Sequence, residues 1–190
     1  MMTIVIFQLV ILILLLFILV SNFTSSYFGS PYLKSRKEII QKALKTAKLK
    51  PGEILYDLGC GNGDVLIEAE NIGAKAIGYE ISPFYYLWAK MRIFIWRKMY
   101  TSSRWSGKSG TVNGRMKIIF QNMVNVNLSK ADVVYCYLMP STLEKLTSKF
   151  QKELKKTARL ISIDFQIKNM HLIDKLKVQN HTIYLYRSIL

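Results

Sequence analysis

The sequence contains little cysteine and little histidine, and these shortages exclude two classes of protein. Its 190 residues include two cysteines, Cys60 and Cys136, which are too few for a disulfide framework. Neither cysteine lies in a CxxC motif or has histidines at the spacing of zinc ligands, so we expect no metal site. A zinc module and a disulfide-stabilised secreted domain are therefore disfavoured.

Acidic residues are also scarce, with 12 Asp and Glu against 27 Lys and Arg and a formal charge of +15. Hydrophobic residues make up 51% of the chain, which excludes a disordered basic tail as the whole protein. All charged side chains lie between Lys34 and Arg187. This much positive charge favours an anionic membrane surface or a nucleic acid as partner, and charge alone does not choose between them.

The first segment has no basic residue before Lys34, whereas a signal peptide begins with a basic region. Residues 4–20 are apolar except for Gln8, and as a helix they extend about 26 Å, close to the ~30 Å hydrocarbon core of a bilayer. Basic residues follow this segment, which predicts that the remaining chain lies on the cytoplasmic side. We expect a transmembrane anchor over 1–22, a Ser-rich linker over 23–30 and one domain over 31–190. A cleaved signal peptide and a buried core helix remain the alternatives.

The domain alternates between short apolar runs and helical periodicity. Ser35 and Glu38 match a capping box that would begin the first helix. The expected strands cover 54–57, 74–80, 116–120, 132–137 and 158–165, with further helices after Gly63 and over 83–100 and 141–156. Strands over 175–178 and 182–187 follow at hairpin spacing, and 101–115 is expected to be a loop. The predicted fold is an α/β, Rossmann-like seven-stranded sheet with a C-terminal antiparallel hairpin, preceded by one transmembrane helix.

Three glycines, Gly59, Gly61 and Gly63, follow the first strand and let the backbone approach a ligand closely. Their spacing differs from the G-x-G-x-x-G dinucleotide fingerprint, which disfavours NAD. Asp64 would place a negative charge beside a pyrophosphate, whereas a cofactor with an ammonium and a sulfonium tolerates acids nearby. The turn therefore favours S-adenosylmethionine.

Glu80 ends the second strand, 17 residues after Gly63, where a carboxylate can accept hydrogen bonds from the ribose hydroxyls of a nucleotide cofactor. The alternative without a ligand is an ordinary tight turn followed by a solvated strand end. The ordered combination of strand, glycine turn and acidic strand end favours cofactor binding.

Residues Leu55–Gly63 resemble motif I of the class I, seven-stranded methyltransferases, and Gly78–Glu80 resembles their ribose-binding strand end. Within that superfamily the chain is similar to the membrane-anchored protein-lysine methyltransferases, whose mitochondrial members modify the c-subunit of ATP synthase or the adenine nucleotide translocase, and to their archaeal relatives. The segments that carry this likeness are Pro31-Tyr32, Tyr79-Glu80-Ile81-Ser82-Pro83, Tyr137-Leu138-Met139-Pro140-Ser141 and Ile163-Asp164-Phe165.

The resemblance implies which residues bind the cofactor. They are Tyr32, Asp57, Gly59, Cys60, Gly61, Gly63, Glu80, Ile81, Asn122 and Met123. The glycine turn and Asp57 would surround the methionine part, and Glu80 would hold the ribose. Asn122 stands where the family usually has an acidic residue at the adenine, and its amide oxygen is also an acceptor.

Methyl transfer from a sulfonium is a direct displacement, so positioning supplies most of the catalysis. The candidate catalytic residues at the strand ends are Tyr137, Pro140, Asp164 and Phe165. Asp164 is the acid among them and would accept a proton or orient the amine, while a helix cap or a loop salt bridge explains it equally well.

The histidines and the aromatic residues of 83–100 do not distinguish between the possible functions. The histidines, His171 and His181, have no matching ligand set and are expected to be structural or exposed. The aromatic residues of 83–100 suit either a lipid-facing belt or a buried core.

The expected function is therefore a membrane-tethered, single-pass, S-adenosylmethionine-dependent protein-lysine N-methyltransferase whose domain lies on the cytoplasmic side. Its partners would be a protein substrate at the membrane and the membrane itself. A methyltransferase acting on a lipid, quinone or other small molecule is one alternative, and a non-catalytic cofactor-binding or RNA-binding module is another. Nucleic acid is not excluded by the charge, and the sequence does not fix the oligomeric state or the acceptor.

Overall fold

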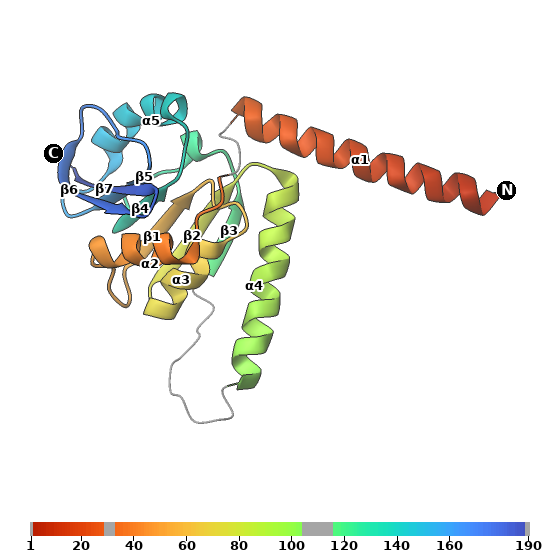
Figure 1. Ribbon diagram of the computed structural model, residues 1–190, viewed down its shortest axis with the longest axis horizontal. Coiled ribbons are helices and arrows are strands. Elements are labelled where there is room, and N and C mark those ends of the chain that lie inside the picture. Colours follow the sequence, from red (N-terminus) through yellow and green to blue (C-terminus); the bar gives the residue numbers. More distant parts are fainter. Residues whose placement is uncertain (1, 29–32, 104–115, 189–190) are drawn as a thin grey trace.

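A computed structural model describes residues 2–28, 33–103 and 116–188 of the chain, and it contains one mixed seven-stranded sheet with helices on both faces (Figure 1). The strand order is β3-β2-β1-β4-β5-β7-β6. The strands are β1 (Ile54–Leu58), β2 (Lys75–Glu80), β3 (Met116–Phe120), β4 (Val133–Cys136), β5 (Arg159–Ile163), β6 (His171–Val178) and β7 (His181–Arg187). The first five pair in parallel, whereas β7 pairs antiparallel with both β5 and β6. This confirms the predicted Rossmann-like fold with its C-terminal hairpin.

The helices follow the strands in the predicted alternation. They are α1 (Met2–Phe28), α2 (Lys37–Thr46), α3 (Asp64–Ile72), α4 (Pro83–Ser103) and α5 (Pro140–Glu153), with a short 3₁₀ turn, η2 (Met123–Asn125). The strand order reverses between β1 and β4, which pair in parallel and so end at the same edge of the sheet. In open α/β sheets this switch point is where ligands bind.

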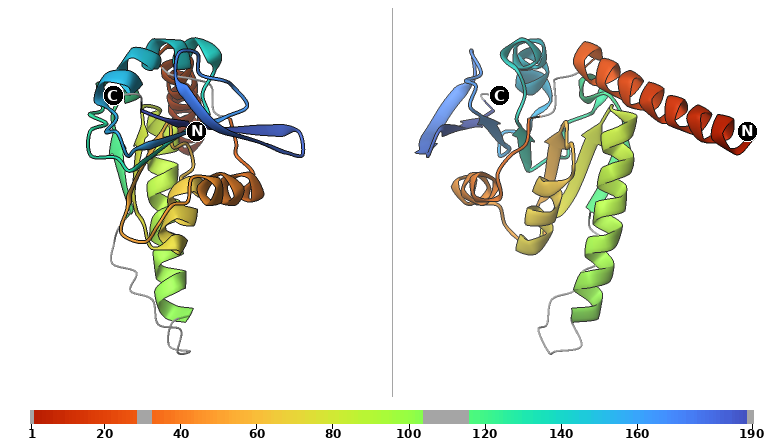
Figure 2. Two further views of the ribbon diagram at one scale, coloured as in Figure 1. Left: turned by 90° about the vertical axis from the view of Figure 1, so that its left-hand side faces the viewer. Right: turned by 45° about the vertical axis from the view of Figure 1, so that its right-hand side comes forward.

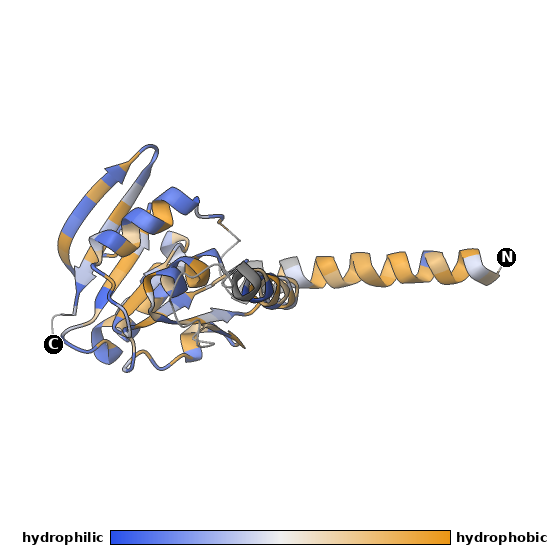
Figure 3. Cartoon of the chain, turned by 90° about the horizontal axis from the view of Figure 1, so that it is seen from below, coloured by the Kyte–Doolittle hydropathy of each residue, from blue (hydrophilic) through white to orange (hydrophobic). Residues whose placement is uncertain are grey.

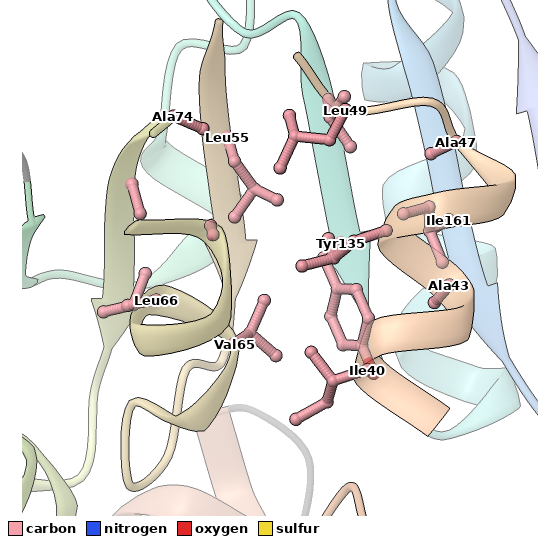
Figure 4. Close-up of a cluster of buried hydrophobic side chains, with 14 of the residues drawn as sticks. Ile40, Ala43, Ala47, Leu49, Leu55, Val65, Leu66, Ala74, Tyr135 and Ile161 are labelled. Carbon is pink, nitrogen blue, oxygen red and sulfur yellow. The ribbon is translucent and has the colours of Figure 1, made fainter. Parts of the chain in front are cut away.

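Two hydrophobic clusters hold the sheet between its helices. On one face, α2 and α3 cover the central strands, and Ile40, Leu66 and Tyr135 belong to one buried cluster with residues of β1 and β5 (Figure 4). On the other face, Phe150 of α5 is fully buried in a second cluster with side chains of β4 and β7. A strand buried on both faces carries apolar residues in sequence, which explains the continuous runs in β4 and β5.

The structure corrects the predicted start of α2. The helix begins at Lys37 with Arg36 as its N-cap, and no side chain caps it. The Ser35 hydroxyl lies 3.1 Å from the phenol oxygen of buried Tyr135 instead, which gives that oxygen a hydrogen-bond partner. Glu38 accepts a hydrogen bond from Gln179 at 2.9 Å. The capping-box prediction was wrong because tertiary partners outcompete the local cap.

Two other boundaries differ from the prediction. Residues 101–103 of the expected loop continue α4, and 104–115 lie outside the described residues. The hairpin strand β6 begins at His171 rather than at residue 175, and a two-residue turn at Gln179 and Asn180 joins it to β7. Gln179 has a φ of +54°, as the favoured two-residue hairpin turns require.

Helix α1 projects away from the domain and is apolar along nearly its whole length (Figures 2 and 3). Within the described residues it is the one helix long and apolar enough to cross a bilayer, over Met2–Ser21, and its residues 2–20 are exposed while Ser21 is buried. The helix continues to Phe28, so residues 23–28 of the expected linker are helical.

Candidate active site

The glycine turn connects β1 to α3 at the switch point of the sheet. Gly59, Gly61 and Gly63 have φ angles of +79°, +50° and +81°, a region that side chains with a Cβ rarely adopt. Gly63 is also the N-cap residue of α3. The turn therefore directs the first backbone amides of α3 toward the space above β1, as an anion or a polar ligand needs.

The turn is held close against β2 by backbone hydrogen bonds and by a small residue. The amides of Gly59 and Cys60 both donate to the Tyr79 carbonyl, at 2.9 and 3.1 Å. A Cβ added at Gly78 would lie 2.6 Å from the Cys60 Sγ. Cys60 is buried and its thiol pKa is raised by burial and by neighbouring carboxylates, so it fills space beneath the turn.

Glu80 is buried at the end of β2, and its carboxylate accepts hydrogen bonds that hold the glycine turn in place. Its Oε2 accepts from the Gly61 amide at 2.9 Å, and its Oε1 accepts from the amides of Ile81 and Ser82 at 2.9 and 2.8 Å. Burial raises the pKa of Glu80, while these amides favour its charged form. An ionised carboxylate offers about four acceptor positions, so one remains on Oε2. In this geometry Glu80 has room for one ribose hydroxyl.

Asp57 lies at the floor of a cavity between the glycine turn and β4. The cavity is lined by Leu33, Ser35, Asp57, Gly59, Cys60, Asn62, Asp64, Val65, Tyr135 and Tyr137. The Asp57 side chain is 3% exposed, and no hydrogen bond reaches it from the part of the chain that the structure describes. Burial and the charges of Glu80 and Asp64 raise its pKa well above the usual value.

This charge distribution fits a cationic ligand group. Asp64 is already paired with Arg92 at 2.8 Å, whereas no ion pair or hydrogen bond reaches the Asp57 carboxyl from the described residues. A buried carboxylate without a partner is costly unless a ligand supplies one. The ammonium and sulfonium of S-adenosylmethionine would supply positive charge at this place, and Glu80 retains an acceptor position that a ribose hydroxyl could use. The residues present therefore fit that cofactor.

The residues expected at the adenine lie beside the same turn. Met123 is buried, and its Cε lies 3.6 Å from the position of a Cβ at Gly59. The Asn122 side chain caps η2 by accepting from the Val124 amide at 3.0 Å. An amide oxygen is a hydrogen-bond acceptor, which recognition of the adenine amino group would require. Tyr32 lies outside the described residues.

A hydrogen-bonded group of three side chains stands at the edge of the cavity. The Tyr137 hydroxyl donates to Asp164 Oδ2 at 2.6 Å, and His181 Nδ1 lies 2.8 Å from the same oxygen. The tyrosine and histidine rings meet edge to face, 6.2 Å between centroids. The three residues lie at the ends of β4 and β5 and at the start of β7, which meet at this edge of the sheet.

The backbone of Asp164 is fixed as firmly as its side chain. Its φ is +63°, and it exchanges hydrogen bonds with the Thr182 backbone through its amide and through Oδ1. Burial alone would raise the pKa of Asp164, but hydrogen bonds from Tyr137, Thr182 and His181 outweigh it and leave the pKa below its usual value. Burial and the Asp164 carboxylate raise the pKa of Tyr137, which keeps it a neutral phenol.

The structure does not place the other two candidate catalytic residues at this cavity. Pro140 is exposed at the start of α5 and borders a separate pocket between α5 and residues 166–169. Phe165 packs against the hydrophobic cluster on the α5 face of the sheet. Tyr137 packs against the opposite cluster.

His181 is the site residue that sequence reasoning missed. The register of β5 and β7 pairs Ile163 with Ile183, which brings His181 beside Asp164. Antiparallel pairing of the last strand with the fifth would have been the signal, and the hairpin spacing alone does not give it. Within the described residues, no group of three or more His, Cys, Asp or Glu side chains is arranged to hold a metal ion.

Comparison with known proteins gives relatives over most of the chain. Residues 57–174 match the family model described as the ANTKMT methyltransferase domain. A protein-lysine N-methyltransferase of Saccharolobus islandicus is 34% identical, with 82% of this chain and 92% of that protein covered. The adenine nucleotide translocase lysine N-methyltransferase of Mus musculus is 30% identical, and a Homo sapiens lysine N-methyltransferase named for the C-subunit of ATP synthase is 26% identical. These alignments cover 72% and 71% of this chain, which spans about half of each mammalian protein, 54% and 52%.

Among solved structures, the fold is similar to that of an RNA methyltransferase from Salinibacter ruber in complex with S-adenosyl-L-homocysteine, with a TM-score of 0.69. That match covers 83% of this chain and 95% of the other at 24% identity, so it shows the fold alone. The family match contains Asp57, Glu80, Tyr137 and Asp164. The chain therefore belongs to the family of the ANTKMT methyltransferase domain and is a class I, S-adenosylmethionine-dependent methyltransferase.

Proposed function

We propose that this protein is a membrane-tethered protein-lysine N-methyltransferase. The observation that carries the proposal is the group of Tyr137, Asp164 and His181 beside the acidic cavity, in a chain whose relatives are named for lysine methylation. Bound S-adenosylmethionine supplies an electrophilic methyl group on sulfur. The protein has to hold that group and bring a neutral amine in line with it.

In this proposal the cofactor is held by Asp57, Glu80 and the glycine turn. Asp57 binds the ammonium of the methionine part, because it is the buried carboxylate without a partner among the described residues. Glu80 accepts from a ribose hydroxyl through the free position on Oε2. Met123 and Asn122 contact the adenine.

Tyr137 positions the acceptor amine. Its hydroxyl has one hydrogen, which it donates to Asp164, so the lone pairs of its oxygen are left to accept from an N–H of the substrate. A lysine that has lost its extra proton to solvent donates one N–H to this oxygen, and its nitrogen lone pair is then free to attack. His181 and Thr182 fix Asp164, which in turn fixes the direction of the Tyr137 hydroxyl.

The tethering part of the proposal assigns the anchor to residues 1–22, the linker to 23–30 and the enzyme domain to 31–190. Support comes from the exposed apolar helix over Met2–Ser21 and from the basic residues that follow it. Basic residues close to a span are retained on the cytoplasmic side. The enzyme domain then lies on that side, and its acceptor lies at or near the membrane.

Label transfer tests the acceptor class. The full chain is incubated with methyl-labelled S-adenosylmethionine and membranes from its source, and protein, lipid and RNA fractions are separated. We expect the label in a protein band that resists lipid extraction and on methylated lysine after hydrolysis. A Glu80→Ala variant is the control and should transfer little label.

Other outcomes identify the competing functions. Label in the lipid fraction contradicts the lysine assignment and favours a lipid or quinone acceptor. Label in RNA, or cofactor binding without any transfer, contradicts it in favour of an RNA-directed or non-catalytic role.

A further inference from the structure

Helix α4 exposes an apolar surface on the side away from the sheet. We call it the α4 stripe, and it consists of Leu87, Trp88, Met91, Phe94, Ile95 and Met99, which are between 44% and 68% exposed. These positions recur every three or four residues, so they lie along one side of the helix. The opposite side contains buried Ala89 and Ile93 and packs against the sheet.

The helix is longer than the sheet requires. Its 21 residues extend about 31 Å, whereas the five residues of β3 beside it extend about 17 Å. A helix that only covered the edge of the sheet would need about half of this length. The remainder presents apolar and aromatic side chains to the outside, which soluble surfaces avoid on this scale.

The charges on α4 are all of one sign. Its ionisable residues of the Asp, Glu, Lys and Arg types are Lys90, Arg92, Arg97 and Lys98. Arg92 and Arg97 are bound to Asp64 and to the Met116 carbonyl. Lys90 and Lys98 are exposed and lie over aromatic rings of α4 itself, at 5.1 and 4.8 Å from the ring centroids. Lysines beside exposed aromatic residues are typical of helices that lie in the headgroup region of a bilayer.

The position of α4 relative to α1 agrees with such a role. The two helices are in contact, and α1 leaves the domain on the side that α4 covers, with α4 running across its direction (Figures 1 and 3). If α1 crosses a bilayer, α4 lies along the surface of that bilayer. The stripe then faces lipid, because it points away from the sheet.

We propose that α4 is an in-plane membrane helix: the α4 stripe inserts among the lipids of the leaflet from which α1 emerges, and Lys90 and Lys98 bind anionic lipid headgroups. The inference rests on the proposed tethering through α1. A lipid surface is favoured over a protein partner because α4 contacts the helix that would span the membrane and every charge on α4 is positive.

This contact determines where substrates are modified. Helix α4 begins at Pro83, three residues after Glu80, so the cofactor-binding edge of the sheet lies at the end of the membrane-bound helix. With both α1 and α4 in contact with the bilayer, the domain cannot turn its cavity toward distant solvent. The acceptor lysines are those close to the membrane surface.

The test uses tryptophan quenching in the full chain. The protein is reconstituted in phosphatidylcholine vesicles containing phosphatidylglycerol, with Trp88 as its one tryptophan through Trp96→Phe and Trp105→Phe. We expect lipids brominated on their acyl chains to reduce Trp88 emission to less than about half. A matched chain that keeps Trp96 instead, which packs against the core, should be quenched much less.

Two substitutions test the stripe directly in the Trp88 chain. Met91→Glu together with Phe94→Glu should restore most of the emission, because two carboxylates oppose insertion. Leu172→Glu together with Leu176→Glu is the matched control on β6, at the far edge of the sheet, and should leave the quenching unchanged.

The contrary results are distinguishable from failure of the proposed function. Unquenched Trp88 in a chain that resists alkaline extraction from the vesicles overturns the α4 proposal alone. Trp88 that is shielded from aqueous iodide but not quenched by brominated lipid also overturns it, in favour of a protein partner. A chain that alkaline extraction removes contradicts tethering by α1, and methyl transfer is measured separately on the same vesicles.

Discussion

Replacement of Asp57 by asparagine should weaken cofactor binding while it stabilises the empty protein. Asparagine has nearly the same shape, so the substitution removes the charge and leaves the packing of β1 intact. The pKa of Asp57 is raised by burial and by Glu80 and Asp64, which means that its charged form is unfavourable in the folded chain. We expect both changes because the same charge that attracts the ammonium of the cofactor is unfavourable without it.

The size of the binding effect follows from Coulomb's law. Two unit charges ~4 Å apart interact by about 4 kcal/mol at an effective dielectric constant of ~20. Desolvation of the incoming ammonium offsets roughly half of this, which leaves about 2 kcal/mol, or a weakening of about 30-fold.

Isothermal titration calorimetry with S-adenosylhomocysteine, on the full chain in detergent, measures the affinity. Thermal unfolding without cofactor measures stability, where each kcal/mol corresponds to a shift of about 2–4 °C for a chain of this size. Asp174→Asn is the matched control, since Asp174 is an exposed carboxylate on β6. Unchanged affinity in the Asp57→Asn variant, or a lower melting temperature, would refute the reasoning.

Three further predictions concern the scaffold of the site. Glu80→Gln should weaken S-adenosylhomocysteine binding by about 1–3 kcal/mol and also lower stability, because an amide NH₂ then faces backbone N–H donors; calorimetry and thermal unfolding test this, and an unaltered Kd would contradict the ribose assignment. The lowered pKa of Asp164 means that its stabilising contribution is present above the unfolded pKa of about 3.9 and is lost as the pH falls through the folded value, so Asp164→Asn should flatten the acid side of a stability profile between about pH 2 and 5. An acid limb as steep as the wild type's would count against the assigned hydrogen bonds. Gly78→Ala should destabilise by about 2–3 kcal/mol, because its Cβ would meet the Cys60 Sγ at 2.6 Å; a melting temperature equal to that of the wild type would contradict this.

The parts of the fold that depend on local pattern were predictable. The apolar run of β1, the glycine turn after it and the acidic end of β2 specify their conformations within a few residues of chain. The alternation of strands and helices then leaves few topologies open, since parallel strands need crossover helices. The capping box at Ser35 failed because a residue 100 positions away, Tyr135, binds its hydroxyl.

Some residues of the candidate site were predictable from the sequence, and others depend on the tertiary structure. Asp57, the glycines and Glu80 are adjacent to the first two strands, and their order along the chain indicates a cofactor site. The grouping of Tyr137 and Asp164 with His181 depends on how β7 pairs with β5. Sequence spacing could not separate Pro140 and Phe165 from this group, although they face the other side of the sheet.

The sequence predicted the helix that carries the aromatic residues of 83–100, but it did not predict which of its side chains are exposed. Their composition was equally compatible with a core and with a lipid-facing belt. Tertiary packing buries Ala89 and Ile93 and leaves Trp88 and Phe94 outside.

The sequence by itself determined the fold class, the cofactor and the apolar first helix, because short-range hydrophobic periodicity and glycine geometry are local properties. The tertiary structure decided which distant side chains share a hydrogen bond and which face of a helix remains exposed, because these depend on strand register and on the packing of the sheet. His181 beside Asp164 and the unburied side of α4 both follow from that packing.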